Sequence, residues 1–514
     1  MGKPDRKVGR RDWVAPAAAL AGGLSLGASF VDFRLWPVPW LAMAPLVALA
    51  EASAPRRAFL LGWLAGIAGI AGAFSWLVYA FQVFGGFSLP LALALFVVPV
   101  VWMALQIGLF TGLLAWLGPL PLGLAAPLTY TVVEFVFPTL FPWRLAHTQN
   151  RMVPLLQSGE IVGPFLLGFA IVWVSAGVVQ LLREGRRTPL VAASALVLAL
   201  WISGAHRVAA IDTARQSARM LRVGVIQGNI GVERKGDRTF FRRNLEDYRR
   251  LSRDLAQRVD LLVWPETVAQ LPIASGTRMP PPEAHPFPDP PRQLVFGGLA
   301  VDQGAEGRRL YNSAFLLSTT GEIVGRYDKR VLVPFGEYPP FATQLPWLRR
   351  ISPATGHFTA GDEPGLLIAA DDVRLGPLIC YEDVIPGPAR AAVTRGATLL
   401  LNLTNDAWYG ASAEPFQHQA LALWRAVETR RDFIRSTNTG LTTAISASGA
   451  VLGELPIFVE DTLVVETRLL ELTTFYTKYG DVFAWGLVVV WVGAAGWRSL
   501  RTRPTRHRVS TVPG

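Results

Sequence analysis

Three residues of types that carry nucleophilic catalysis each follow the end of an expected strand: Glu266, Lys329 and Cys380. Cys380 is the single cysteine, and polar side chains come directly after it. A thiol becomes a nucleophile when a base or a cation lies nearby, and a carboxylate and an ammonium group would supply both. This combination predicts a nucleophilic Cys380 that is activated by Glu266 and Lys329.

Each of the three residues also has a structural interpretation. A lone cysteine is commonly a small buried apolar side chain, and isolated Glu and Lys residues are commonly exposed. Their positions favour chemistry, because Glu266 follows Pro265 at the end of a short apolar segment and Lys329 precedes another. The carboxyl ends of strands are where α/β proteins place catalytic groups.

The region 206–478 has the composition of a soluble domain in which strands and helices alternate. The helices expected from apolar spacing and composition cover 238–259 and 415–431. The expected strands cover 221–229, 260–264, 293–301, 311–318, 322–327, 375–379, 398–403, 433–438 and 441–446. The proline-rich stretch 269–292 is expected to be a loop without regular structure.

A second long irregular stretch, 338–362, carries apolar side chains that include Trp347, Leu348 and Phe358. Apolar residues in so long a loop indicate a lid or an arm that touches a membrane. The alternative is a loop that packs on its own domain.

The first two hundred residues are almost entirely apolar, and they predict a membrane domain over 1–205. About seven spans are expected there and an eighth near the end, since ~20 apolar residues cross the hydrocarbon layer. The expected spans are 13–30, 36–51, 58–81, 87–116, 120–141, 160–182, 188–205 and 480–497. The region 479–514 is then a last transmembrane helix followed by a cytoplasmic tail.

The orientation follows from arginine and lysine residues in the short connections. The basic start, Arg56 with Arg57, the loop after 182 and the end of the chain fall on one side, which is the cytoplasmic side. The catalytic domain is therefore expected outside the cytoplasm, in the bacterial periplasm. Arg144 and Arg151 are exceptions to the pattern.

Two residues of the membrane part have more than one interpretation. Glu134 lies inside an apolar run, where a carboxylate needs a partner, and it serves either function or a structural hydrogen bond to a neighbouring helix. Trp143 is either an interfacial anchor or part of the lining of a lipid access route.

Composition excludes several classes of site. The net charge of +11 is concentrated in the tails and short loops, so it is interpreted as membrane topology and not as nucleic-acid binding. No phosphate-binding glycine loop stands out, and His285, His357 and His418 are scattered, so neither a metal site nor a cofactor is expected. One cysteine permits no intramolecular disulfide, and a monomer is expected.

Several short motifs together resemble the nitrilase (carbon–nitrogen hydrolase) superfamily. They lie at 225–229, 264–266, 327–329, 333–337, 380–382, 405–408 and 437–440. With the predicted spans, the whole chain is similar to the apolipoprotein N-acyltransferase family of bacterial inner membranes. The resemblance implies a polytopic α-helical membrane bundle of about eight spans joined to an α/β nitrilase-like α-β-β-α sandwich. It also implies the catalytic triad Glu266, Lys329 and Cys380, a second glutamate at Glu337, and the pair Tyr381 and Glu382.

The resemblance further implies that a membrane phospholipid donates an acyl chain to Cys380 as a thioester. The acceptor would be the N-terminal amine of a diacylglyceryl-cysteine apolipoprotein. The sequence departs from the family at Gly236, after Lys235, where a tryptophan is common. If that tryptophan helps to hold lipid, either another aromatic residue such as Phe240 substitutes for it or the contact is absent.

Two other functions are compatible with parts of the sequence. A membrane-tethered amidase or nitrilase would hydrolyse a C–N bond with water, but a small polar substrate would not need lipid-facing loops. A binding or transport protein with an inactive enzyme-like domain would be expected to have lost part of the triad, and all three residues are present.

Overall fold

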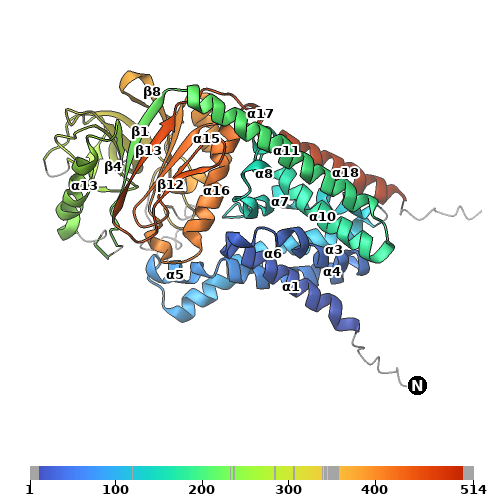
Figure 1. The fold of residues 1–514 in the computed structure, drawn as a ribbon. Coiled ribbons are helices and arrows are strands. Elements are labelled where there is room, and N and C mark those ends of the chain that lie inside the picture. Colours follow the sequence, from blue (N-terminus) through green and yellow to red (C-terminus); the bar gives the residue numbers. More distant parts are fainter. Residues whose placement is uncertain are drawn as a thin grey trace, which may run out of the picture.

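The structure is a computed structural model of the full chain of 514 residues. It describes residues 11–501 except for 119, 232, 235–237, 283, 284, 305, 306, 339, 341–343 and 345–357. A helical membrane bundle and a two-sheet sandwich lie side by side (Figure 1). Most of the expected loop 338–362, together with Lys235, Gly236 and His357, falls outside the described residues.

The first sheet of the sandwich carries Glu266 and Lys329. Its strands run in the order β13-β1-β2-β4-β5-β6, and β3 pairs with β4 off this path. Strands β1, β2 and β4 are parallel, whereas β4, β5 and β6 are connected as antiparallel hairpins. The strands are β1 (Met220–Gln227), β2 (Leu261–Val263), β3 (Ala269–Ala274), β4 (Gln293–Gly304), β5 (Gly307–Leu317), β6 (Ile323–Asp328) and β13 (Asp461–Arg468).

The second sheet carries Cys380, and its order is β12-β11-β10-β9-β8-β7. Its central strands β8, β9 and β10 are parallel, so their carboxyl ends meet at one edge. The strands are β7 (Leu367–Ala369), β8 (Val373–Ile379), β9 (Leu399–Thr404), β10 (Asp432–Thr437), β11 (Thr443–Ile445) and β12 (Val451–Glu454).

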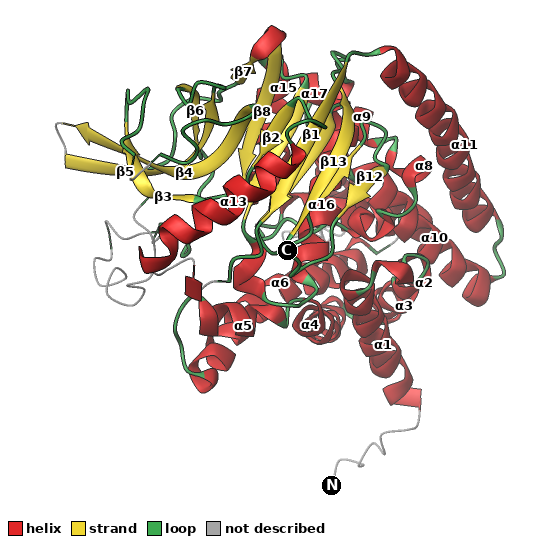
Figure 2. Ribbon diagram, turned by 60° about the vertical axis from the view of Figure 1, so that its left-hand side comes forward, coloured by secondary structure: helices red, strands yellow, loops and turns green. Residues whose placement is uncertain are grey.

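The two sheets pack face to face between helices, which makes four layers (Figure 2). Apolar side chains of both sheets form the inner core, including Val225, Val263, Leu375 and Leu401. Helix α13 (Phe241–Leu255) covers the first sheet, and α15 (Pro386–Thr394) and α16 (Glu414–Thr429) pack on the second. The described residues therefore form the expected α-β-β-α sandwich.

The membrane bundle consists of α1 to α11 together with α18. Their bounds are α1 (Arg11–Val31), α2 (Pro39–Ala42), α3 (Ala44–Ala52), α4 (Pro55–Ala73), α5 (Trp76–Val83), α6 (Leu89–Leu117), α7 (Leu122–Val136), α8 (Val153–Leu156), α9 (Gly159–Val162), α10 (Phe165–Glu184), α11 (Thr188–Ser217) and α18 (Val482–Arg501). A short helix of the sandwich, α17 (Phe475–Tyr479), precedes α18.

Among the described residues, five helices are long and apolar enough to cross a membrane: α1, α6, α10, α11 and α18. The pair α4 and α5 makes a sixth if this helix, bent by 56°, counts as one span. The segments at 39–52 and 122–136 are shorter. Helix α7 ends before Pro138, because a residue that precedes proline is disfavoured in the helical conformation. The expected number of eight spans stays a prediction.

The sandwich and the bundle share one continuous apolar core. Trp424 and Val427 of α16 belong to the same buried cluster as Leu156 of α8 and Leu167 of α10. Helix α11 continues beyond the expected boundary at 205 to Ser217 and leads directly into β1 (Figure 1). The two parts are therefore packed together as well as connected by the chain.

Two local expectations differ from the structure. The stretch 269–292 begins with strand β3, although it was expected to lack regular structure. Pro272 is tolerated there because β3 pairs only with β4 and its register shifts between Ala269 and Ile273. Glu134 accepts a hydrogen bond from the backbone N–H of Leu145 at 2.7 Å. The expected structural hydrogen bond is therefore present, but its donor begins the short 3-10 helix η2 (Leu145–Gln149) in the connection after α7 and does not belong to a long membrane helix.

Glycines bring α1 and α4 into close contact. A Cβ atom on Gly27 would overlap the backbone of Gly69, and one on Gly23 would overlap the backbone of Ala65. Small residues at such crossings let helices in a membrane approach each other closely.

Replacing Gly27 with leucine is therefore expected to destabilise the bundle by about 1–3 kcal/mol, because overpacking forces the helices apart. The thermal midpoint of the detergent-solubilised protein, followed by tryptophan fluorescence, should fall. Gly72→Leu on α4 is the control, since a Cβ atom there meets no neighbouring atom within 4 Å. Equal midpoints for both variants would contradict the close contact.

Candidate active site

The three residues singled out by the sequence follow strand ends of the two sheets. Glu266 comes three residues after β2, Lys329 directly after β6, and Cys380 directly after β8. The Lys329 Nζ lies 3.9 Å from Glu266 Oε1, and both groups are close enough to the Cys380 sulfur to shift its pKa. The structure thus brings together a thiol, an ammonium group and a carboxylate from three separate parts of the chain.

Lys329 is almost completely buried, and its nearest partner is Glu337. The distance from Nζ to Glu337 Oε2 is 2.8 Å, and the lysine side chain is 1% exposed. Burial alone would lower the pKa of Lys329, but the carboxylates of Glu337 and Glu266 outweigh burial and raise it. The ammonium group therefore stays charged at neutral pH.

Asn312 holds the two glutamates in place, and the sequence analysis missed it. Its Nδ2 donates to Glu266 Oε1 at 2.7 Å and to Glu337 Oε1 at 3.0 Å. Glu337 also accepts from the backbone N–H of Val333 at 2.9 Å. A single asparagine within β5 has no spacing that distinguishes it in the sequence.

The backbone around Glu266 is tightly constrained. Thr267 has a φ of +53°, in the left-handed region that non-glycine residues rarely adopt. Gly297 of β4 lies against this turn, and a Cβ atom there would come within 2.6 Å of the Glu266 Cα. A glycine at 297 is what lets the turn pack against the sheet.

Cys380 begins a one-turn 3-10 helix, η5 (Cys380–Asp383), with a left-handed φ of +51°. Its carbonyl accepts from Asn402 Nδ2 of β9 at 3.0 Å, which ties the turn to the neighbouring strand. Burial is the largest influence on the Cys380 thiol and raises its pKa, as does Glu266, whereas Lys329 acts in the opposite direction. The resting sulfur is therefore a thiol, and it requires a base to react.

Glu382 is fully buried, and its carboxylate is occupied by hydrogen bonds. It accepts from the Tyr327 hydroxyl at 2.9 Å and from the backbone N–H groups of residues 330, 331 and 379 at 2.7, 3.1 and 2.8 Å. These bonds connect the segment after Lys329 to the turn of Cys380. The geometry fits a positioning role for Glu382.

Tyr381 lies between the sandwich and the membrane bundle. Its hydroxyl donates to the backbone carbonyl of Leu140, and its ring contacts Phe141 edge to face at 6.2 Å between centroids. The residue after Cys380 thus contacts the segment that follows α7.

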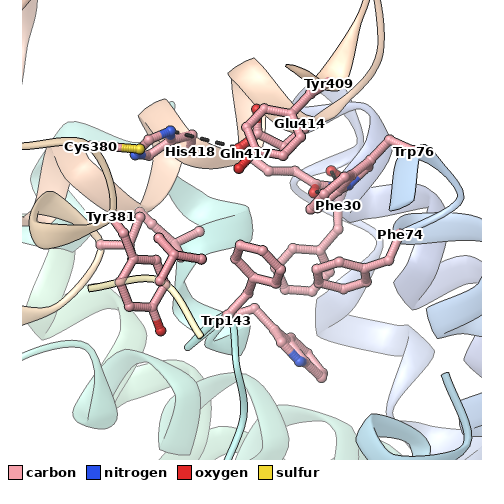
Figure 3. Close-up of a pocket in the computed structure, with 14 residues that line it drawn as sticks. Phe30, Phe74, Trp76, Trp143, Cys380, Tyr381, Tyr409, Glu414, Gln417 and His418 are labelled. Atoms are coloured by element: carbon pink, nitrogen blue, oxygen red, sulfur yellow. Dashed lines mark hydrogen bonds and ion pairs between the residues drawn. The ribbon is translucent and has the colours of Figure 1, made fainter. Parts of the chain in front are cut away.

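An apolar pocket opens at Cys380 (Figure 3). Its lining comes from both parts of the protein: Phe30, Phe74, Trp76, Phe141 and Trp143 from the membrane bundle, and Val333, Cys380, Tyr381, Val384, Tyr409, Glu414, Gln417, His418 and Leu421 from the sandwich. Trp143 is buried and packs edge to face on Phe30, so it lines the pocket. Phe240, the candidate substitute for a family tryptophan, does not line this pocket and has the guanidinium of Arg234 over its ring.

His418 lies in a cluster of ionisable side chains that the sequence analysis did not predict. Helix α16 carries His418 and Glu414 on one face, next to the segment that follows β9, so that Asp406, Glu414 and His418 place ligand-type atoms within 4.8 Å of one another. The cluster already holds cations, because Asp383 lies between His418 and Arg435. Burial would lower the pKa of His418, but Asp383 outweighs burial and raises it to about 10.

Glu414 completes the charge balance of this cluster. Burial, followed by the nearby charge of Asp406, raises the pKa of Glu414 well above its usual range. A neutral Glu414 leaves two carboxylates, Asp383 and Asp406, opposite two cations, His418 and Arg435. The cluster is thus a buried ion-pair network beside the pocket.

Comparison with known proteins identifies two regions of the chain. The family model of carbon–nitrogen hydrolases matches residues 222–475. The model of the apolipoprotein N-acyltransferase N-terminal domain matches residues 22–177. These regions correspond to the sandwich and to most of the membrane bundle.

Curated relatives resemble the chain over nearly its whole length. The apolipoprotein N-acyltransferase of Geobacter metallireducens is 35% identical over 505 residues, which cover 94% of each chain. The enzyme of Azotobacter vinelandii is 32% identical and covers 98% of each chain. Among solved structures, an amidase of Nesterenkonia from the nitrilase superfamily matches with a TM-score of 0.35 and 22% identity, covering 50% of this chain and 93% of its own. On the strength of the full-length relatives, the chain belongs to the apolipoprotein N-acyltransferase family.

Proposed function

We propose that this protein transfers an acyl chain from a membrane phospholipid to the N-terminal amine of a diacylglyceryl-cysteine apolipoprotein, through a thioester on Cys380. The observation that carries the proposal is the apolar pocket at Cys380, whose aromatic lining comes largely from the membrane helices. A pocket of this composition suits an acyl chain, and the thiol at its opening suits the ester carbonyl.

In the first half-reaction, Glu266 removes the proton of the Cys380 thiol as the sulfur attacks the ester carbonyl carbon. A C–S bond forms, and the carbonyl oxygen becomes an oxyanion. Lys329 stabilises that charge together with the backbone N–H of Tyr381. When the C–O bond breaks, Glu266 returns the proton to the leaving oxygen, and a lysophospholipid departs.

In the second half-reaction, the neutral amine of the acceptor attacks the thioester carbonyl. A C–N bond forms, Glu266 takes a proton from the nitrogen, and the C–S bond breaks. The proton passes to the departing sulfur, so the enzyme returns to its starting state with an amide as product. The same base and cation therefore serve both halves of the reaction.

Glu337, Asn312 and Glu382 act through other residues. Glu337 fixes the ammonium group of Lys329 at 2.8 Å, and Asn312 aligns Glu337 with Glu266. Glu382 holds the nucleophile turn against the segment that follows Lys329. Tyr381 contributes its backbone N–H, while its side chain contacts the membrane part.

A membrane-tethered amidase that uses water is the alternative, and the pocket argues against it. A thioester that is open to water hydrolyses, so an acyltransferase must exclude water from the reacting carbonyl. Aromatic side chains from α1, from α5 and from the segments after α4 and α7 surround the approach to Cys380, which suits a lipid substrate better than a small polar amide.

We further propose that the sandwich lies on the periplasmic side of the bacterial inner membrane and that the protein acts as a monomer. The distribution of arginines over the short connections supports the orientation. Both proposed substrates are lipids in that leaflet.

A reporter fused after Arg207 is expected to lie outside the cytoplasm, and a reporter fused at Gly514 inside it. The reason is the odd number of spans predicted before the sandwich and the single span predicted after it. Alkaline phosphatase and green fluorescent protein fusions measure the two sides. Both reporters on the same side would contradict the orientation.

Incubated with phospholipid alone, the enzyme is expected to accumulate an acyl group on Cys380 that hydroxylamine removes. Mass spectrometry of the intact protein detects the adduct, and a diacylglyceryl peptide with a free amine should discharge it to an amide. Cys380→Ala should form no adduct, and Glu266→Gln should slow acylation by on the order of a hundredfold, because proton transfer is lost. Acyl transfer without Cys380 would disprove the nucleophile, and discharge mainly to water would favour the hydrolase.

The rate at which iodoacetamide alkylates Cys380 is expected to rise about tenfold per pH unit above neutral pH, because alkylation needs the thiolate and the pKa of this thiol is raised. Lys329→Met removes the cation that favours the thiolate, so its curve should move to higher pH. Lys478→Met is the control, since Lys478 lies on the surface over Tyr479. A rate that is already constant near neutral pH would show that the resting sulfur is ionised.

A further inference from the structure

Two consecutive residues of α16, Gln417 and His418, connect this helix to different parts of the site. Both are buried, and both line the pocket at Cys380 (Figure 3). Gln417 contacts the ends of membrane helices, whereas His418 contacts the nucleophile turn. The two residues therefore link the ends of the membrane helices to the turn of Cys380.

Gln417 uses its side-chain amide to join three membrane segments. Its Nε2 donates to the carbonyl of Phe30 at 3.0 Å and to the carbonyl of Ala73 at 2.8 Å, and its Oε1 accepts from Trp76 Nε1 at 3.0 Å. Phe30 and Ala73 lie in the last turns of α1 and α4, where helix carbonyls have no partner within the helix. Gln417 therefore satisfies two such carbonyls and holds the bend between α4 and α5.

The segments that Gln417 holds also form the wall of the pocket. The rings of Phe30, Phe74 and Trp76 line it, and Trp76 packs edge to face on Phe141 and Tyr409 at 5.3 and 5.1 Å between centroids. A change in the bend between α4 and α5 moves this aromatic wall relative to Cys380. Gln417 thus holds the segments that carry this wall.

His418 contacts the turn that carries Cys380, on the opposite side of the pocket from the contacts of Gln417 (Figure 3). Its Nε2 lies 2.7 Å from Asp383 Oδ1, and Asp383 Oδ2 accepts from Arg435 Nε at 2.9 Å. Asp383 is the last residue of η5, which begins with Cys380. The imidazole Nδ1 lies 3.3 Å from Asp406, so His418 is held between two carboxylates. The nucleophile turn is thereby fixed to α16.

We propose that Gln417 and His418 are a pair of positioning residues that align the acyl chain with the nucleophile. Gln417 sets the depth of the pocket and hence the preferred acyl-chain length, and His418 sets the orientation of the Cys380 turn. The proposal rests on the acyl transfer proposed above. Reacting atoms must meet at ~3–3.5 Å, and a misplacement of about 1 Å costs on the order of a hundredfold in rate. The wall of the acyl-chain pocket and the turn of Cys380 therefore need to be held by the same element, which is α16.

The two residues are expected to affect different measurements. Gln417→Met keeps the size of the side chain but loses all three hydrogen bonds, so discrimination between acyl chains of different length should fall by roughly tenfold. The KM for phospholipid should rise, while the rate of Cys380 alkylation by iodoacetamide should stay that of the wild type. A merely structural role would not change the preferred chain length.

His418→Leu is expected to lower kcat by about ten- to a hundredfold and to change the alkylation rate of Cys380, without altering the preferred chain length. His418→Gln can still donate to Asp383 from a similar position, so it should recover part of kcat. That recovery distinguishes the contact with Asp383 from a general effect of altering the core.

Gln419→Leu is the matched control on the same helix. Gln419 is equally buried and donates to Thr443 and Glu454 at 2.9 and 2.6 Å, away from both the pocket and the nucleophile turn. This variant should lower the thermal midpoint but leave chain-length preference, kcat and the alkylation rate unchanged.

The experiment uses the purified full chain with phospholipids of increasing saturated acyl-chain length and a diacylglyceryl peptide as acceptor, with alkylation measured in parallel. Unchanged chain-length preference in Gln417→Met, or unchanged kcat and alkylation in His418→Leu, would overturn the proposal. So would a Gln419→Leu variant that changes the same measurements. If the wild type transferred no acyl chain, the proposed function would fail, whereas the order of alkylation rates would still test His418.

Discussion

A buried ammonium group is the constraint on which the rest of the site depends. A charge in a protein interior is tolerated only when it is paired, and Lys329 is 1% exposed. Glu337 and Glu266 provide the pairing, and Asn312 holds both of them. Strands β2 and β6, β5 and the segment after Lys329 must therefore bring these side chains together. In the proposed reaction, the same charge that the fold must neutralise at rest would stabilise the oxyanion.

The sequence indicated candidate site residues best where they follow the end of an expected strand. The proximity of Glu266, Lys329 and Cys380 could be predicted because each follows the end of an expected strand. The order of strands and helices indicated an α/β domain, and the family resemblance implied the sandwich. Asn312, Gln417 and His418 could not be predicted, because their roles depend on contacts with residues far away in the chain. Strand β3 was missed because one pairing partner and a register shift accommodate its proline.

The shared core explains why a membrane bundle and a soluble fold act as one enzyme. Helix α16 covers the second sheet with one face and packs on the membrane helices with another, so apolar side chains of both parts are buried in one cluster. The pocket lies where these parts meet, and neither part alone could form it. Burial of apolar surface thus holds the bundle and the sandwich together, and it forms the substrate pocket at the same place.

Helix α11 joins the two parts with almost no linker, since only Ala218 and Arg219 separate it from β1. A helix that runs directly into a central strand leaves the sandwich little freedom to rise or tilt. The distance of the Cys380 sulfur from the membrane helices is then set by the fold. Bilayer thickness varies between membranes, and a helix bundle responds to a mismatch at a modest energetic cost. The composition of the surrounding membrane, which sets its thickness, therefore affects the position of the ester carbonyl relative to the sulfur.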